Sequence, residues 1–252
     1  MRSLTIFALT ALLGSPTMQA ADLPATHIAA AIAAPERSDK DRERDQKDRP
    51  AEVMAFAGIR PGMAIADVFG GGGYWTELLA RAVGPDGKVS LVNNSPYLNF
   101  ALEDLKTRFT KDRLPNVTRR TVETCDMKLG AAGYDLILIV MSYHDLYYVD
   151  EEGGWPAIHA SGFLDQLHAA LKPGGSLLII DHAAANGSGS AHAGDLHRIE
   201  EAFAKRDLES HGFKLEKTWD GYRNSSDDLS KIVFDPAVRG KTDRFTHLYR
   251  RD

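Results

Sequence analysis

The chain has 252 residues but only one cysteine, Cys125, and no surplus of basic side chains. A single cysteine cannot form an internal disulfide, so the fold must be held together by its apolar core. The formal net charge of −5 removes the usual electrostatic basis for binding nucleic acid, because no basic excess is available to neutralise phosphates. The composition is otherwise ordinary, which predicts a globular protein with one domain of roughly 200 residues.

The apolar run near the N-terminus, residues 4–14, is shorter than the roughly 20 residues that a transmembrane helix needs. It follows a basic residue and precedes Pro16 and several small residues. This pattern is typical of a cleavable secretory signal peptide over residues 1–20, so we expect a periplasmic or secreted protein with no membrane association after cleavage. The charged residues 21–49 are expected to form an exposed helical arm or a solvated linker to a domain over residues 50–252.

Strand patterns alternate with helix patterns from Arg49 onward. Alternation of this kind predicts an α/β fold with a mainly parallel sheet and helices on both faces. In such sheets ligands bind beyond the carboxyl ends of the strands, so the loops that follow the strands are the places to look for function. We expect strands at 63–69, 88–94, 116–122, 134–142, 176–182, 213–223 and 244–251, and helices at 50–58, 74–84, 96–109, 158–171 and 196–211.

Four consecutive glycines follow the first strand, in the sequence DVFGGGGYW that starts at Asp67. Glycines there let a backbone approach a ligand, and the helix that follows offers free N–H groups. A nicotinamide-binding loop would need a third motif glycine where Thr76 stands. An acid ahead of the glycines also suits a cationic ligand better than a pyrophosphate, so a nicotinamide-dependent oxidoreductase is disfavoured.

The same loop resembles the first motif of the class I S-adenosylmethionine-dependent methyltransferases, D-x-G-x-G-x-G. Asp67, Gly71 and Gly73 match this motif, whereas Phe69 stands at the first glycine position. The segments GIRPGM, AVGPDGKV, YDLILIVMS and LKPGGSLLIIDH extend the resemblance in the same order, and with the signal peptide the chain resembles an exported "predicted methyltransferase" subgroup. The resemblance implies a Rossmann-like, mainly parallel seven-stranded sheet with one antiparallel strand near its edge. It also implies S-adenosyl-L-methionine as cofactor and a small-molecule acceptor.

Carried over residue by residue, the resemblance places Asp67 near the methionine end of the cofactor or its sugar. Phe69, Gly71 and Gly73 would pack against the cofactor. Asn93, with Asn94 after it, ends the second strand where the family usually has an acid that holds the ribose hydroxyls. An amide can still bond a hydroxyl, but without the strength of a charge-assisted bond.

After the third strand, Glu123 falls where the family has an acid that accepts a hydrogen bond from the adenine amino group. Asp126 is the second candidate for this position. Cys125, between the two acids, is expected to be buried packing rather than a chemical group.

The fourth strand ends at His144 and Asp145, where the methyl acceptor would meet the cofactor. Methyl transfer to a neutral oxygen or nitrogen releases a proton, and a histidine with a pKa near 6.5 is a suitable base. The other interpretation is that the two residues only shape the loop. The fifth strand ends in a similar pair, Asp181 and His182, and we take His144, Asp145 and His182 as the candidate catalytic residues.

A divalent metal is a further possibility at this edge, because imidazoles and carboxylates gather there. The loop after the fifth strand adds His192, Asp195 and His197, with Asp195 a suitable N-cap for the helix that follows. The spacing matches no standard ligand set, so no metal ligand is assigned. Four aromatic residues are expected either to line a pocket for the acceptor or to cover the sheet edge: Tyr143, Tyr147, Tyr148 and Trp155. Four polar residues between the last two strands are expected to belong to a lid: Arg223, Asn224, Asp235 and Arg239.

Two functions of different classes therefore stay open. The first is an S-adenosylmethionine-dependent methyltransferase that acts on a small molecule. The second is an exported protein that keeps the fold but binds another ligand or a divalent metal without methyl transfer. The second is favoured by the location, because cells make the cofactor in the cytoplasm, and by Phe69 and Asn93. The oligomeric state is undetermined.

Overall fold

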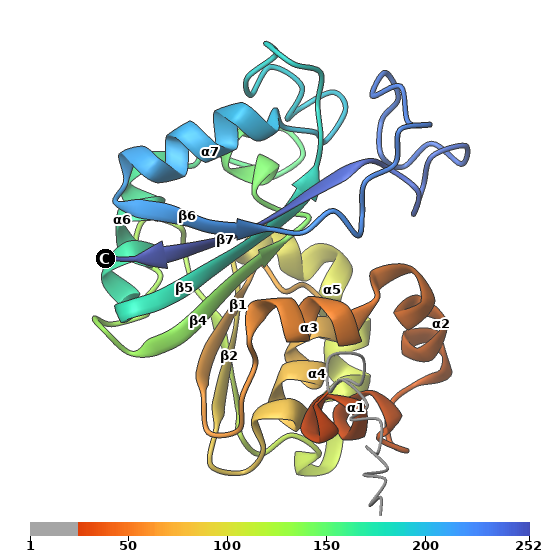
Figure 1. Ribbon diagram of the computed structural model, residues 1–252, viewed down its shortest axis with the longest axis vertical. Helices are drawn as coiled ribbons and strands as arrows, with labels where there is room; N and C mark the ends of the chain where they lie inside the picture. The colour runs from red at the N-terminus through yellow and green to blue at the C-terminus, as the bar shows by residue number, and fades with distance from the viewer. Residues whose placement is uncertain (1–24) are drawn as a thin grey trace, which may run out of the picture.

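The structure, a computed structural model, describes residues 25–252. The expected signal peptide lies outside the described residues. Figure 1 shows the arrangement of the helices and strands in space. In chain order they are α1 (Thr26–Ala33), α2 (Asp39–Asp48), α3 (Pro50–Ala57), β1 (Ala64–Val68), α4 (Tyr74–Val83), β2 (Lys88–Asn93), α5 (Ser95–Arg108), β3 (Val117–Thr121), β4 (Tyr134–Val140), α6 (Ala160–Ala170), β5 (Leu171–His182), α7 (Glu201–Ser210), β6 (Phe213–Thr218) and β7 (Arg244–Arg251), with short 3₁₀ turns η1 (Thr110–Asp112) and η2 (His144–Tyr147).

The seven strands form one sheet in the order β3-β2-β1-β4-β5-β7-β6. The pairs from β3 to β5 are parallel, and β7 runs antiparallel to both β5 and β6. The fold is therefore α/β with a seven-stranded, mainly parallel sheet as expected, and the sheet is mixed because β7 runs antiparallel to its two neighbours. The strand order reverses between β1 and β4, and ligands of open α/β sheets bind at such a point.

Helices cover both faces of the sheet, because the central strands are apolar on both sides (Figure 1). Alternation along β1 shows this: Ile65 packs with α1, α3 and α4, whereas Ala66 and Val68 pack with α6 and α7. All three side chains are fully buried. The apolar runs that predicted the strands thus contribute side chains to both halves of the core, one on each face of the sheet.

The N-terminal helices belong to this folded body. Ile28 and Ala31 of α1 are buried in the same cluster as α4. In α2, Asp41 lies 2.6 Å from Arg108 at the end of α5, and Tyr74 donates a hydrogen bond of 2.7 Å to Asp45. Residues 26–48 therefore pack on the domain instead of forming a solvated linker, and the charges that suggested a linker are used in ion pairs with it.

The helix expected at 196–211 begins later, at Glu201. Before the helix, the chain returns to the end of β5 and pairs there in the same direction, through a parallel bridge between Ala183 and Ile199. Asp195 consequently caps no helix, and its carboxylate lies 3.1 Å from Nδ1 of His192. Tertiary pairing with β5 thus outweighs the local helix signal.

Among residues 25–252, no helix combines the length and the apolar character that crossing a membrane would need.

Candidate functional site

The glycine loop after β1 carries an unusual backbone at its first position. Phe69 has a φ of +55°, a left-handed conformation that costs a non-glycine residue about 1–2 kcal/mol. Its ring is buried and lies stacked on two others, 4.7 Å from Tyr97 and 5.3 Å from Phe163 between ring centroids. Phe69 therefore packs into the core beneath the loop. It stands at the position of the first motif glycine, and its ring belongs to the buried aromatic cluster with Tyr97 and Phe163.

Asp67 lies under the glycines rather than beside a ligand. It is 1% exposed, and its Oδ2 accepts a hydrogen bond of 2.5 Å from the Thr76 hydroxyl. Burial raises the pKa of Asp67 to about 6, although the hydrogen bonds from Thr76 act in the opposite direction. A Cβ on Gly70 would come within 2.5 Å of the same carboxylate oxygen. Asp67 thus supports the loop, and its contact with the cofactor stays a prediction.

Asn93, at the end of β2, holds the glycine loop from the other side. Its Oδ1 accepts a hydrogen bond from the N–H of Gly71 at 2.9 Å, and its Nδ2 donates to the Gly71 carbonyl at 3.0 Å. Both ends of this amide are engaged and the residue is 2% exposed. Asn94 caps α5 by accepting from the N–H of Tyr97. The residues expected to hold ribose hydroxyls are therefore used to shape the loop and the helix.

The acids after β3 lie at the exposed rim of this region. Glu123 accepts a hydrogen bond of 2.9 Å from the Ser95 hydroxyl at the start of α5. Asp126 is exposed and forms an ion pair with Lys128, whose hydrogen bond lowers the pKa of Asp126. Cys125 is exposed, not buried as expected, because the turn that carries it lies outside the core. Of the two acids, Glu123 is the one that lies next to the end of β2.

His144 and Asp181 form the central contact at the ends of β4 and β5. Nδ1 of His144 lies 2.8 Å from Asp181 Oδ1, and the backbone N–H of His144 donates to Oδ2 at 2.7 Å. Both residues are buried. A carboxylate on Nδ1 fixes the orientation of the ring and directs Nε2 away from the sheet.

The charge of His144 differs from the sequence-based expectation. Burial lowers its pKa, but the carboxylates of Asp181 and Asp145 outweigh that effect and raise the pKa to about 9. The free chain thus carries a proton on His144 at neutral pH, so the expected base would first have to lose it. Burial lowers the pKa of His182 to about 3, and its Nδ1 lies 2.7 Å from the Thr242 hydroxyl. The two histidines therefore carry different charges.

Three polar atoms meet on the outer side of His144. Its Nε2 lies 3.3 Å from Nδ1 of His197 and 3.3 Å from Oδ1 of Asp145. The other carboxylate oxygen of Asp145 accepts a hydrogen bond from the Tyr97 hydroxyl. Tyr97, which also stacks on Phe69, thus links the glycine loop to the His144 turn.

A buried ion pair fixes the loop that carries His197. Arg198 and Asp227 are fully buried and lie 2.9 Å apart, and Arg198 also donates to the carbonyl of Ala183 at 3.0 Å. Because Ala183 follows β5 directly, this anchor holds His197 against the ends of β4 and β5. His197 itself has a φ of +53° and is half-buried.

Comparisons with known proteins agree with this architecture. A solved methyltransferase of Aquifex aeolicus, described as dependent on S-adenosylmethionine, superposes with a TM-score of 0.58 and 22% identity over 84% of this chain and 97% of its own. The arsenic(III) S-adenosylmethionine methyltransferase of Chlamydomonas reinhardtii superposes with a TM-score of 0.55 and 16% identity, over 90% of this chain and 74% of its own. The chain has the fold of the class I S-adenosylmethionine-dependent methyltransferases. S-adenosyl-L-methionine is therefore the expected cofactor.

Sequence comparison supports the same relationship over part of the chain. The ubiquinone/menaquinone biosynthesis C-methyltransferases UbiE of Cupriavidus taiwanensis and Hydrogenovibrio crunogenus are each 25% identical, over 133 and 137 residues. These matches cover 51% of this chain, and the chain spans about half the length of the relatives, 47% and 46%. A scan against models of protein families found no match. The [4+2]-cyclase SpnF shares this methyltransferase fold, with a TM-score of 0.55 and 14% identity over 84% of this chain and 80% of its own, so the fold alone does not decide the reaction.

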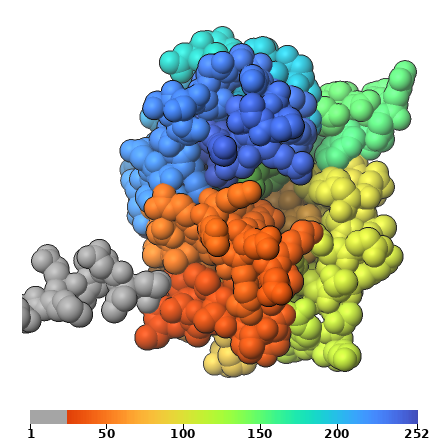
Figure 2. Space-filling model, turned by 90° about the vertical axis from the view of Figure 1, so that its right-hand side faces the viewer, coloured from red at the N-terminus to blue at the C-terminus, as the bar shows by residue number. Residues whose placement is uncertain are grey.

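A hollow of about 630 Å³ opens beside His182 and Met141 at the carboxyl edge of the sheet. Figure 2 shows it between the orange N-terminal helices and the blue residues that precede β7. Its size suits a small molecule. Arg239, from the expected lid, lines this hollow, whereas Arg223 and Asn224 bond to Asp243 near the start of β7.

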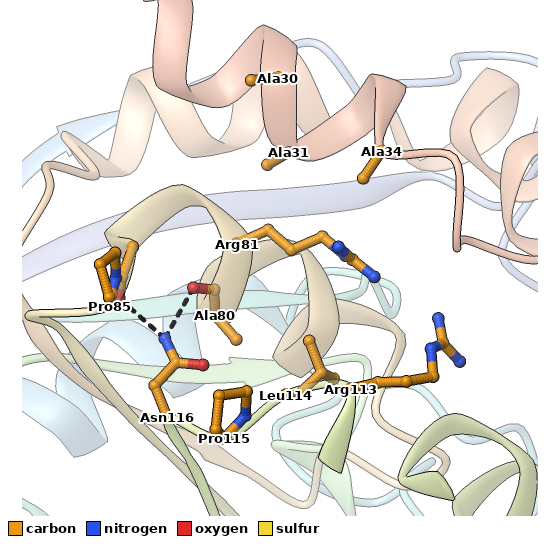
Figure 3. Close-up of a pocket in the computed structure, with 11 residues that line it drawn as sticks. Ala30, Ala31, Ala34, Ala80, Arg81, Pro85, Arg113, Leu114, Pro115 and Asn116 are labelled. Carbon is orange, nitrogen blue, oxygen red and sulfur yellow. Dashed lines mark hydrogen bonds between the residues drawn. The ribbon is translucent and has the colours of Figure 1, made fainter. Parts of the chain in front are cut away.

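A second hollow, of about 330 Å³, lies far from this edge (Figure 3). It is lined by alanines of α1, by α4 and by residues 113–116, where Asn116 donates to the carbonyls of Ala80 and Gly84. These residues precede β2 and β3, so the hollow lies at the amino ends of the strands. No functional side chain identified above lines it.

The tyrosines near η2 have separate roles. Tyr143 and Tyr147 both donate a hydrogen bond to the carboxylate of Asp207 in α7. They therefore cover the sheet, which is one of the two roles expected for them. Tyr148 lies 5.1 Å from His197 and 5.5 Å from Trp155 between ring centroids, next to the polar cluster.

Sequence reasoning missed Tyr97, which bonds Asp145, and Lys47, which lines the 630 Å³ hollow. Tyr97 follows Asn94 by three residues in an apparent helix and has no motif of its own. Lys47 lies in a segment of mixed charge that suggested only a solvated surface. No local signal distinguished either residue, because their roles arise from contacts with distant elements.

Proposed function

We propose that this chain is an S-adenosylmethionine-dependent methyltransferase that acts on a small, negatively charged molecule. One observation carries the proposal: the glycine loop after β1 and the His144 turn after β4 flank the point where the strand order reverses. Tyr97 contacts both, because it stacks on Phe69 and bonds Asp145. The part of the site for the cofactor and the part for chemistry therefore belong to one continuous edge.

The residues at the outer rim fit a nucleoside. Gly71 has a φ of +55°, and a Cβ there would lie 3.8 Å from the ring of Phe100, which is 62% exposed and offers a flat apolar surface. Glu123 is an exposed hydrogen-bond acceptor beside the first turn of α5. The cofactor would supply the activated methyl group. Asp67 and Asn93 would hold the loop on which it rests.

The hollow beside His182 fits an acceptor with a negative charge. Lys47, Arg239 and Arg244 line it, and the carboxylate among its lining residues, Asp48, already pairs with Arg44 at 2.6 Å. Lys47 and Arg239 form no ion pair within residues 25–252. Arg244 is 6% exposed and lies 3.7 Å from the other carboxylate oxygen of Asp48, and its Nε has no hydrogen-bond partner among the described residues. A carboxylate on the acceptor would pair with Lys47 and Arg239.

The cationic state of His144 suits such an acceptor. A positive charge at Nε2, held by Asp181 on the opposite nitrogen, would favour an acceptor oxygen that binds already deprotonated. Such an oxygen needs no base before it attacks the methyl group, and the sulfur leaves as a neutral thioether. Alignment of the methyl group with the acceptor would supply much of the remaining acceleration. His144 and Asp145 are therefore proposed at the reacting end of the site, and His182 at the wall of the hollow.

A second candidate function is favoured by Asn93. Its two polar ends are both bonded to Gly71, so a ribose would find no free amide there. A protein that keeps the fold but binds another ligand or a divalent metal, without methyl transfer, would show this arrangement. The signal-peptide pattern of residues 1–20 supports a location outside the cytoplasm for either function, and N-terminal sequencing of the chain from the periplasm would test it.

Calorimetric titration with S-adenosylmethionine and its demethylated product separates the two functions. We expect binding, and we expect Glu123→Gln to weaken it by about 10-fold or more, since a hydrogen bond to a charged group contributes roughly 1.5–3 kcal/mol. Asp126→Asn is the matched control, and its affinity should stay within about twofold. No heat with either ligand would refute the methyltransferase proposal and leave the second candidate.

Turnover tests the acceptor. Formation of S-adenosylhomocysteine is measured with a panel of small carboxylic acids and their neutral amides. We expect the acids to be preferred and Arg239→Gln to raise KM for acids while leaving kcat nearly unchanged. Equal rates for acids and amides would contradict the anionic acceptor without affecting the cofactor result.

A further inference from the structure

We propose that the chain binds a divalent transition metal through Nε2 of His144, a carboxylate oxygen of Asp145 and Nδ1 of His197. These three atoms all lie within 4.8 Å of one another. They come from two loops that follow β4 and β5, so the tertiary fold brings them together. The inference does not rest on methyl transfer, because a metal can bind here whatever reaction the chain performs.

The spacing of the three atoms matches metal ligation. Two ligands at 2.0–2.1 Å from a tetrahedral zinc ion lie about 3.3 Å apart. Nε2 of His144 lies 3.3 Å from His197 Nδ1 and 3.3 Å from Asp145 Oδ1. Two of the three edges of a ligand triangle are thus already formed. The third, between Nδ1 of His197 and the carboxylate of Asp145, is no longer than 4.8 Å.

Hydrogen-bond partners orient two of the three ligands, as is usual for the ligands of protein-bound metals. Asp181 lies 2.8 Å from the other ring nitrogen of His144, so Nδ1 keeps its proton and Nε2 is the nitrogen that binds an ion once it is deprotonated. Tyr97 donates to the second oxygen of Asp145 and orients that carboxylate. In the metal-free chain the proton on Nε2 of His144 lies between this nitrogen and its two neighbours, Nδ1 of His197 and Oδ1 of Asp145. A divalent cation would take the place of that proton.

The donor set selects the class of metal. Two imidazoles, both neutral when they bind an ion, and one carboxylate favour Zn²⁺, Fe²⁺, Co²⁺ or Mn²⁺ over Mg²⁺ and Ca²⁺, which prefer oxygen ligands throughout. Three protein ligands also leave a position open, as in catalytic rather than structural sites. The ring of His197 lies 4.9 Å from that of Phe234, which lines the 630 Å³ hollow. The open position would therefore accept water or a ligand from that hollow.

The anchor of the His197 loop supports a built site. The backbone at His197 is left-handed, with a φ of +53°, and it is held in this conformation by the buried pair Arg198–Asp227. Strained backbone persists where the surrounding structure determines it strongly. The ring is thereby kept beside His144 without any ion.

Metal titration tests the proposal. The purified chain is stripped with a chelator, and Zn²⁺ binding is measured by competition with a chromophoric chelator, while Co²⁺ binding is followed by its visible absorption. We expect one ion per chain and a Co²⁺ spectrum of a nitrogen-ligated, low-coordinate site. His197→Ala should weaken Zn²⁺ binding by at least 100-fold. His192→Ala, on the same loop, is the matched control and should bind within about twofold of the wild type.

A positioning variant completes the test. Asp181→Asn keeps the shape of the side chain but should weaken Zn²⁺ binding by about 10–100-fold, the range found when partners of metal-bound histidines are lost. Circular dichroism of each metal-free variant confirms that it is folded. No stoichiometric binding to the wild type would overturn the proposal, and so would unchanged binding to folded His197→Ala, because the ion would then lie elsewhere. Metal binding without binding of S-adenosylmethionine would support this inference while the proposed function fails.

Discussion

Replacing Asp67 by asparagine should change how the stability of the chain depends on pH. Burial raises the pKa of Asp67 to about 6, from about 3.8 in the unfolded chain. Between these values the folded state binds more protons than the unfolded state, so the wild type loses stability as pH rises. The shift of roughly 2 units corresponds to about 3 kcal/mol, since each unit is worth about 1.4 kcal/mol. The Asp67→Asn variant has no such charge to bury.

The measurement is urea unfolding of both proteins from pH 4 to pH 8. The free energy of unfolding of the variant, minus that of the wild type, should rise by about 2–3 kcal/mol over this range. The difference removes the contributions of all other titrating groups and any fixed cost of the new amide next to Thr76. A difference that does not change with pH would refute the assigned burial of a charged Asp67. A fall with increasing pH would mean that the carboxylate is stabilised in the fold.

Two further substitutions test the packing around the site by urea unfolding at neutral pH. Arg198→Met should lower the free energy of unfolding by about 3–5 kcal/mol, because it leaves Asp227 charged and buried without its partner; Arg206→Met, at an exposed position, should change it by less than about 0.5 kcal/mol and serves as control. Phe69→Gly restores the motif glycine and relieves a left-handed φ, but it removes a ring stacked on Tyr97, so a net loss of about 2–4 kcal/mol is expected; a more stable variant would show that the ring is not core packing.

The strands and most helices could be predicted because their signals are local. The run at Tyr134–Val140 is apolar throughout, and only a strand covered on both faces buries every side chain of such a run. Pro50 and Gly58 mark the two ends of α3 in the sequence as they do in the structure. The predicted start of α7, residue 196, was wrong, because the bridge between Ala183 and Ile199 keeps the chain extended until the helix begins at Glu201.

The site was predictable only where a residue type has a fixed use. The glycine loop was found from its spacing, and His144 and Asp145 from their place at the end of a strand. The role of Asn93 could not be predicted, because the sequence does not distinguish an asparagine that binds a ribose from one that binds the backbone of Gly71. The raised pKa of His144 could not be predicted either, since it depends on Asp181, which lies 37 residues away in the chain.

The sequence by itself determined the order of strands and helices, the glycine loop and the identity of the polar residues at the strand ends. These follow from periodicity, from the backbone freedom of glycine and from the rule that parallel strands end at one edge. Only the tertiary structure decided that Phe69 packs inward, that Asn93 binds the loop, and that His144, Asp145 and His197 face one another. The reason is physical: hydrogen-bond partners, burial and charge are set by atoms distant in the chain, and their distances exist only once the sheet is assembled.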